Sequence, residues 1–227
     1  MEVDLVKILR KAFYGRNTLK VAKELLGKYL IHEVNGQIIG GKIVETEAYC
    51  GITDKGAHVY GGKKTLRTMP LYGQEGTVYL YSIYGMYVCL NAITEREGEP
   101  QGVLIRAIEP LIGLDFMANK RSGKNFDELS NKEILNLTSG PSKLCIALDI
   151  TKSLNNTLFW DGEIYIAEKD QNLKALFEIK ENTCGKIIKS KRIGIDYAQE
   201  ARDFLYRFYY EDNPYVSKKD KLKLLDK

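Results

Sequence analysis

Apolar and polar positions near the start of the chain follow first a helical pattern and then a strand pattern. Apolar side chains recur at helical spacing over residues 18–26. The runs 28–34 and 37–46 have the composition of strands, and they flank the dipeptide Asn35-Gly36, which favours a two-residue type I′ turn. We therefore expect a helix followed by an antiparallel β-hairpin.

A second hairpin is expected in the middle of the chain. Its strands cover residues 77–83 and 86–93, and a tight turn at Tyr84-Gly85 joins them. A further strand is expected over residues 102–108. Strands joined by hairpins favour an antiparallel sheet over a parallel one.

The helical pattern of residues 142–148 predicts that helices pack against this sheet. The expected fold class is α+β, with a curved antiparallel sheet (a roll or partly open barrel), helices packed around it and a protruding β-hairpin. Residues 119–136 are polar without periodicity, which is typical of a surface insertion. A short helix is expected over 198–205, and residues 217–227 are expected to form a frayed basic tail.

Length and composition are those of an ordinary globular protein. The chain has 227 residues, of which 44% are hydrophobic and 28% charged, and we expect one domain over residues 1–227. No run approaches the roughly 20 apolar residues that a membrane-spanning helix needs. We expect a cytoplasmic monomer, associated with the nucleoid if the source is bacterial.

Cysteine and histidine content argues against metal sites and disulfide scaffolds. The four cysteines lie far apart, with no CxxC spacing, and the chain has only two histidines. Reduced, buried thiols are the expected state. We expect neither a metal nor a cofactor.

The net charge of +4 is too small to indicate a nucleic-acid partner by itself. Cations are concentrated in two stretches, residues 54–67 and 186–227. Such stretches are either solvated surface or nucleic-acid contacts, and the residues near them distinguish the two interpretations.

Candidate chemistry appears first in the segment GKIVETEAYC. In an extended chain Glu45, Glu47 and Tyr49 share one face, and the two carboxylates lie about 7 Å apart. Glutamates at a strand end either face water or serve a site. His58 lies in a basic loop rich in glycine, which allows a ligand to approach closely, whereas His32 in an alternating strand is assigned no role.

The second candidate segment is TVYLYSIYGMYVCLN, which places Tyr84 at a hairpin tip beside Met86. An aromatic ring at a tip either folds back onto its own domain or needs a partner to cover it. Apolar wedges of this kind enter DNA between base steps, and the cations Lys63 and Arg67 would contact the same duplex. A wedge, stacking rings and a carboxylate that activates water together describe a base-flipping hydrolase that needs no metal.

The ordered stretches LLGKYL, GKIVETEAYCG, GTVYLYSIYGMYVCLN, GVLIRAIEP and SGPSKLC closely resemble the alkyladenine (3-methylpurine) DNA glycosylase family. They cover residues 20–148 almost continuously, and the similarity thins beyond that point. The resemblance implies that Glu47 is the general base and that Arg106 helps to hold the nucleophilic water.

The same resemblance assigns the binding residues. Tyr49, His58 and Tyr81 would sandwich the flipped purine, with a preference for electron-poor, often cationic bases. Tyr84 would fill the gap left in the duplex. Asn91 would clash with the exocyclic amino group of normal guanine and so reject it.

The expected activity is monofunctional hydrolysis of alkylated purines from damaged duplex DNA. 3-Methyladenine is the first expected substrate, followed by hypoxanthine and ethenoadenine, and the product is an abasic site. Two alternatives remain open. One is a binding module of the same fold that recognises distorted DNA or structured RNA, and the other is a magnesium-dependent nuclease that uses Glu45, Glu47 and Asp54 as ligands.

Overall fold

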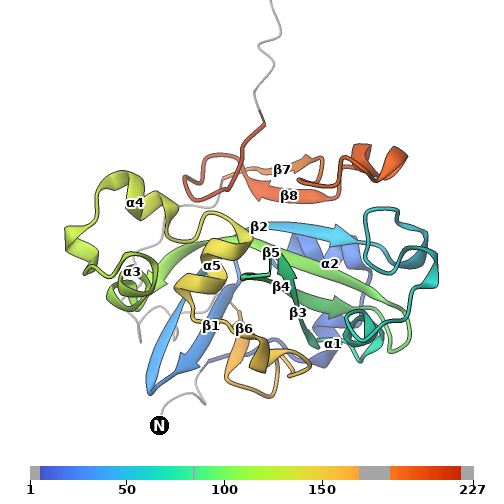
Figure 1. The fold of residues 1–227 in the computed structure, drawn as a ribbon, viewed down its shortest axis with the longest axis horizontal. Coiled ribbons are helices and arrows are strands. Elements are labelled where there is room, and N and C mark those ends of the chain that lie inside the picture. The colour runs from blue at the N-terminus through green and yellow to red at the C-terminus, as the bar shows by residue number, and fades with distance from the viewer. Residues whose placement is uncertain (1–5, 84, 169–184, 221–227) are drawn as a thin grey trace, which may run out of the picture.

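The computed structural model describes residues 6–83, 85–168 and 185–220, which form one curved antiparallel sheet with short helices around it (Figure 1). Within this part the sheet is eight-stranded, with the order β3-β4-β5-β2-β1-β6, while β8 pairs with both β2 and β7. The strands are β1 Tyr29–Val34, β2 Gln37–Tyr49, β3 Val78–Ile83, β4 Tyr87–Thr94, β5 Gln101–Ile112, β6 Ile164–Ala167, β7 Ile187–Ser190 and β8 Arg207–Tyr210. The predicted α+β class is confirmed.

Strands β1 to β5 correspond to the five that the sequence predicts. The first turn is of the predicted type, because Asn35 and Gly36 both have left-handed φ values, +51° and +72°. Strands β6, β7 and β8 were not predicted. Each covers four residues, which is too short a run to show a period.

The helices of the described chain are short. They are α1 Lys11–Tyr14, α2 Thr18–Glu24, α3 Leu114–Ser122, α4 Asn131–Asn136 and α5 Pro141–Ala147. Helices α2 and α5 confirm the two predicted helices, and each packs against strands of the sheet. The helix expected over 198–205 is a 3₁₀ segment, Gln199–Asp203.

The polar segment 119–136 does lie at the surface, but it is not irregular. It contains the end of α3, the 3₁₀ segment Phe126–Glu128 and the helix α4. Ser130 and Glu133 form a capping box at the start of α4, in which each side chain accepts a hydrogen bond from the other's backbone N–H. This local signal starts a helix without the apolar periodicity on which the prediction relied.

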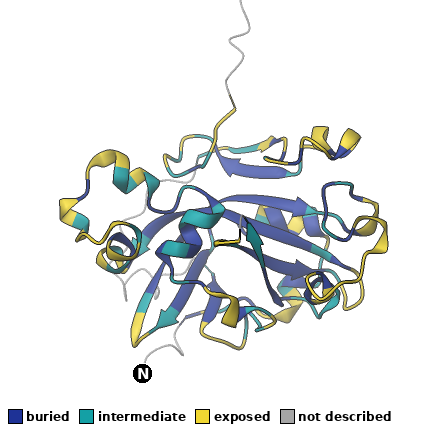
Figure 2. Ribbon diagram, viewed as in Figure 1, coloured by how far each residue is buried: buried dark blue, intermediate teal, exposed yellow. Residues whose placement is uncertain are grey.

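Buried positions concentrate on β2 and β5 at the centre of the sheet (Figure 2). At Gly41 of β2 a Cβ atom would lie 2.1 Å from the carbonyl oxygen of Glu109, so only glycine fits there. Register shifts between Ile43 and Thr46 bend β2. The second half of the strand, which carries the candidate carboxylates, is buried along its length up to Ala48.

The C-terminal segment corrects one prediction. Residues 221–227 lie outside the described part, but residues 217–220 are docked on the body of the protein rather than frayed. The backbone N–H of Ser217 donates to Glu45, and that of Asp220 donates to the Tyr209 hydroxyl.

Three of the four cysteines lie in the described part of the chain. Cys89 and Cys145 are buried free thiols and Cys50 is half-buried, also as a free thiol, whereas Cys184 lies outside the described part. Across residues 6–83, 85–168 and 185–220, the helices are too short and too polar for a membrane crossing.

Candidate active site

A cavity of about 590 Å³ opens where the ends of β2, β3, β4 and β5 meet the loops 56–59 and 193–195. This volume is in the range of small-molecule sites and exceeds that of a purine ring. The cavity brings together six of the predicted site residues, which lie far apart in the sequence: Tyr49, His58, Arg67, Tyr81, Asn91 and Arg106.

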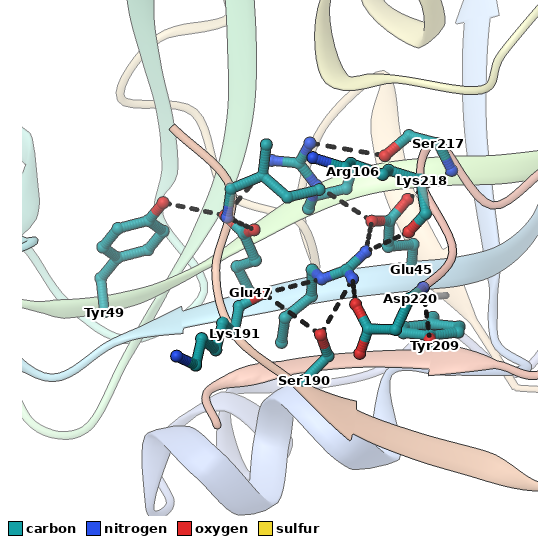
Figure 3. Close-up of polar contacts among 12 residues, drawn as sticks. Glu45, Glu47, Tyr49, Arg106, Ser190, Lys191, Tyr209, Ser217, Lys218 and Asp220 are labelled. Carbon is teal, nitrogen blue, oxygen red and sulfur yellow. Dashed lines mark hydrogen bonds and ion pairs between the residues drawn. The ribbon is translucent and has the colours of Figure 1, made fainter. Parts of the chain in front are cut away.

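Glu47 lies directly behind the cavity wall, and its side chain is fully buried. One carboxylate oxygen accepts the backbone N–H of Ile193 at 2.7 Å, and the other accepts the Tyr49 hydroxyl at 2.9 Å. The second oxygen also pairs with Nη1 of Arg106 at 3.2 Å. Tyr49, Arg106 and Ile193 all line the cavity, so the residues that hold the carboxylate are themselves part of the cavity wall. Figure 3 shows the contacts of Glu47 with Tyr49 and Arg106.

Glu45 shares the face of Glu47, as the strand pattern predicts, but it has a different environment. Its carboxylate accepts hydrogen bonds from Nε of Arg106 at 3.1 Å, from Nη1 of Arg207 at 2.8 Å and from the backbone N–H of Ser217 at 2.8 Å (Figure 3). Glu45 therefore orients Arg106 from behind and balances the charge of Arg207.

Arg106 is the group shared by the two carboxylates. Burial disfavours its charge, but Glu47 and Glu45 raise the pKa of Arg106 above the usual arginine value. The guanidinium is thus a permanent cation, oriented by one carboxylate and presented to the other.

His58 and Tyr81 form adjoining walls of the cavity. Their ring centroids are 4.5 Å apart and the rings are nearly perpendicular, at 89°. Burial, and then the nearby charge of Arg67, lower the pKa of His58 to about 4, so the imidazole is neutral at pH 7. Arg67 lies 3.1 Å from Nε2 and can only donate there, so Nδ1 carries the proton and donates to the Tyr79 hydroxyl at 3.0 Å.

Asn91 lies in the wall formed by β3 and β4. Its Nδ2 donates to the backbone oxygens of Tyr79 at 3.1 Å and Cys89 at 3.3 Å, which fixes the amide in place. His32, for which the sequence predicts no role, is buried on β1 and does not line the cavity. Its Nδ1 lies 2.7 Å from the backbone oxygen of Leu148.

The predicted DNA-contact residues lie around the cavity or beyond it. Lys63 and Arg67 are exposed and line a second hollow of about 470 Å³ that shares His58 and Arg67 with the cavity. Met86 is 77% exposed beside the tip of the β3–β4 hairpin. Tyr84 lies outside the described residues.

The carboxylates of the nuclease alternative do not converge. Asp54 forms a two-pronged ion pair with Arg192, while Glu45 and Glu47 are paired with Arg106. The described part of the chain contains no group of three or more His, Cys, Asp or Glu side chains that could hold a metal ion. These carboxylates serve as partners of arginines, which does not favour a magnesium nuclease.

Sequence reasoning missed the C-terminal contribution to the site. Arg192 and Ile193 come from the loop after β7, and Arg207 begins β8. The available signal is indirect. Two glutamates on a buried strand need cationic or N–H partners, and the motif RIGIDYA supplies one of them, the Ile193 N–H.

Comparison with known proteins agrees with the geometry. A family model described as methylpurine-DNA glycosylase (MPG) matches residues 12–214. A relative from Clostridium tetani named "Putative 3-methyladenine DNA glycosylase" is 57% identical over 215 residues, which are 94% of this chain and 100% of the relative. Relatives of the same name from Clostridium perfringens and Desulfitobacterium hafniense are 55% identical over 213 residues (93% of this chain, 99% of the relative) and 49% identical over 214 residues (94% and 100%). The chain therefore belongs to the methylpurine-DNA glycosylase family.

Proposed function

We propose that this protein excises alkylated purines from duplex DNA by hydrolysing the N-glycosidic bond. 3-Methyladenine is the first proposed substrate, and hypoxanthine and ethenoadenine are further ones. The observation that carries the proposal is the Glu47 carboxylate, which is buried directly behind the wall of an aromatic cavity and bound by two groups of that wall, Arg106 and the Ile193 N–H. The relatives named for 3-methyladenine support the substrate.

Recognition begins with extrusion of the damaged nucleotide from the duplex. The purine stacks among Tyr49, His58 and Tyr81, whose π faces attract electron-poor rings. The neutral state of His58 supports this role, because a protonated imidazole would repel a cationic base. Asn91 stands at the wall against which the amino group of guanine would press.

Hydrolysis requires a base that takes a proton from water as the water attacks C1′. Glu47 performs this step, and the developing positive charge on the sugar is stabilised by the same carboxylate. Arg106 holds the water and the carboxylate in a fixed relation. A cationic base such as 3-methyladenine leaves without further protonation.

The reaction is proposed to stop at the abasic site. Strand cleavage through a Schiff base needs an amine nucleophile in the pocket. Among the described residues that line the cavity there is no lysine. The alternative of a pure binding module leaves the buried Glu47–Arg106 pair without a task, since binding needs no carboxylate beside the reacting carbon.

The test is incubation with a methylated duplex in EDTA, followed by chromatography of the supernatant. The expected result is free 3-methyladenine, with strand breaks appearing only after alkali. An undamaged duplex is the control. Absence of released base, or a protein–DNA adduct trapped by borohydride, contradicts the proposal.

A further inference from the structure

Behind the cavity wall lies an ion pair that the proposed reaction does not use. The Arg192 side chain is fully buried and donates to Asp54 through two bonds, of 2.5 and 2.8 Å. It also donates to the backbone oxygens of Ala48 at 2.9 Å and Ala201 at 3.2 Å. Arg192 is therefore locked in one position.

Arg192 lies behind the ring of Tyr49, one of the three rings on which the purine is proposed to stack. The guanidinium carbon of Arg192 lies 4.8 Å from the centroid of the Tyr49 ring and 5.4 Å from that of Tyr206. Tyr49 lines the cavity, whereas Arg192 does not. Tyr49 therefore separates a fixed positive charge from the space in which the purine is proposed to stack.

The local backbone is shaped to keep the pair in place. A Cβ atom at Gly56 would lie 2.9 Å from Nη2 of Arg192, so the loop must have glycine to pass this close. The backbone N–H groups of Cys50 and Gly56 donate to Asp54 at 3.0 and 2.9 Å. Burial alone would raise the pKa of Asp54, but Arg192 and these N–H groups lower it below its usual value.

The other charges around the cavity are already compensated. Arg106 and Arg207 together balance Glu45 and Glu47, and His58 is neutral at pH 7. Arg67 is exposed at the rim, where solvent screens it. The charges that act on a cationic purine stacked on Tyr49 therefore include the Arg192–Asp54 pair behind the ring, together with Glu47 and Arg106.

We propose that Asp54 is a specificity-determining residue that cancels the charge of Arg192 behind Tyr49 and thereby lets positively charged purines stack on that ring. A base on the cavity side would lie about 8 Å from the guanidinium, taking an ordinary stacking separation beyond the ring. Coulomb's law at that distance in a partly buried site gives an effect on the order of tenfold in binding. This inference rests on the proposed function, since it assumes that the purine occupies this cavity.

The experiment measures charge preference, defined as the Kd for a neutral base divided by the Kd for a cationic one. The probes are two duplexes that differ in one nucleotide, 2′-fluoro-deoxyinosine (neutral) or 2′-fluoro-3-methyldeoxyadenosine (cationic), both of which resist hydrolysis. Because preference is a ratio, it is independent of the fraction of protein that is folded. An undamaged duplex is measured in parallel.

Asp54→Asn leaves the cation unbalanced, so the preference is expected to fall about tenfold. Arg192→Gln removes the cation and leaves the carboxylate, so the preference is expected to rise. The double variant is expected to return toward the wild-type value, and Arg192→Lys, which keeps the charge, to stay near it. Either single variant carries the test if the other fails to fold.

Opposite signs cannot come from damage to packing, because both substitutions disturb the same contacts. A preference that stays unchanged, or that moves in the same direction in both variants, overturns the inference. The proposed function fails separately, if the wild-type protein binds neither probe more tightly than the undamaged duplex.

Discussion

Removal of the C-terminal segment is predicted to destabilise the protein, although sequence pattern marks that segment as a loose tail. The informative variant ends at Val216. This variant loses the hydrogen bond from the Ser217 N–H to Glu45, at 2.8 Å, and the one from Nη1 of Arg207 to the Lys218 carbonyl, at 2.6 Å. It also loses the contact of Asp220 with Nη2 of Arg207, at 3.0 Å.

The magnitude follows from the burial of the groups left behind. Glu45 is fully buried and Arg207 is 1% exposed, so each loses a hydrogen bond to a buried charge. Such bonds contribute about 1.5–3 kcal/mol each. Asp220 is half exposed and adds at most about 1 kcal/mol. Water that reaches the uncovered groups offsets part of the loss, which leaves about 2–4 kcal/mol.

The assay is thermal and urea unfolding of two shortened chains. The matched control ends at Asp220 and keeps all the contacts just described. For a chain of this size, a loss of 3 kcal/mol lowers Tm by about 6–12 °C. Equal stability of the two chains would refute the reasoning, because it would mean that the docked residues 217–220 contribute nothing to the buried charges.

Three further predictions concern the cavity and its support. The His58 imidazole is expected to stay neutral down to about pH 5 in an NMR titration, because its pKa is about 4 in the folded chain against 6.5 in the unfolded chain. The stability that His58 contributes is therefore full above pH 6.5 and is lost as the pH falls toward 4. Arg67→Gln should raise the pKa of His58, because it removes a nearby positive charge. Tyr81→Phe should keep affinity for damaged duplex, while Tyr81→Leu should weaken it by about 1–3 kcal/mol in titrations, since the ring rather than the hydroxyl stacks; equal losses would argue for a hydroxyl role. Gly56→Ala should lower the free energy of unfolding in urea by about 1–3 kcal/mol, because its Cβ would lie 2.9 Å from Arg192, and an unchanged value would show that the guanidinium can move.

Much of the fold could be predicted from local patterns. The Asn35-Gly36 turn fixes the register of β1 and β2, and periodicity marks the other long strands. The four-residue strand β8 could not be found this way. Its place in the sheet depends on pairing with β2, between Glu45 and Tyr209 among others, which is a contact across more than half of the chain.

The candidate site divides in the same way. The shared face of Glu45, Glu47 and Tyr49 follows from the two-residue period of a strand, and the structure agrees. The partners of these groups do not follow from any local rule. Arg192 and Arg207 have the sequence context of surface cations, and only the tertiary fold buries them against carboxylates.

The resemblance singles out Glu47 as the general base, but it could not reveal the contacts that give the two glutamates different environments. Glu45 contacts two arginines and a backbone N–H, whereas Glu47 contacts one arginine, a tyrosine hydroxyl and a backbone N–H. In sequence they are equivalent carboxylates two positions apart. Strand β8 pairs with both positions of β2. Their environments differ because Arg207 and the Ser217 N–H reach Glu45, whereas Tyr49 and the Ile193 N–H, which belong to the cavity wall, reach Glu47.

The most direct test of the account is single-turnover base release by Glu47→Gln. The amide keeps the size of the side chain but cannot take a proton from water, so release of 3-methyladenine should fall by at least about 100-fold. The affinity of the variant for a duplex with a non-hydrolysable lesion, measured below the unfolding temperature, should remain close to that of the wild type. This control shows that the variant is folded. Release within about tenfold of the wild-type rate would contradict the assignment of Glu47 as the base.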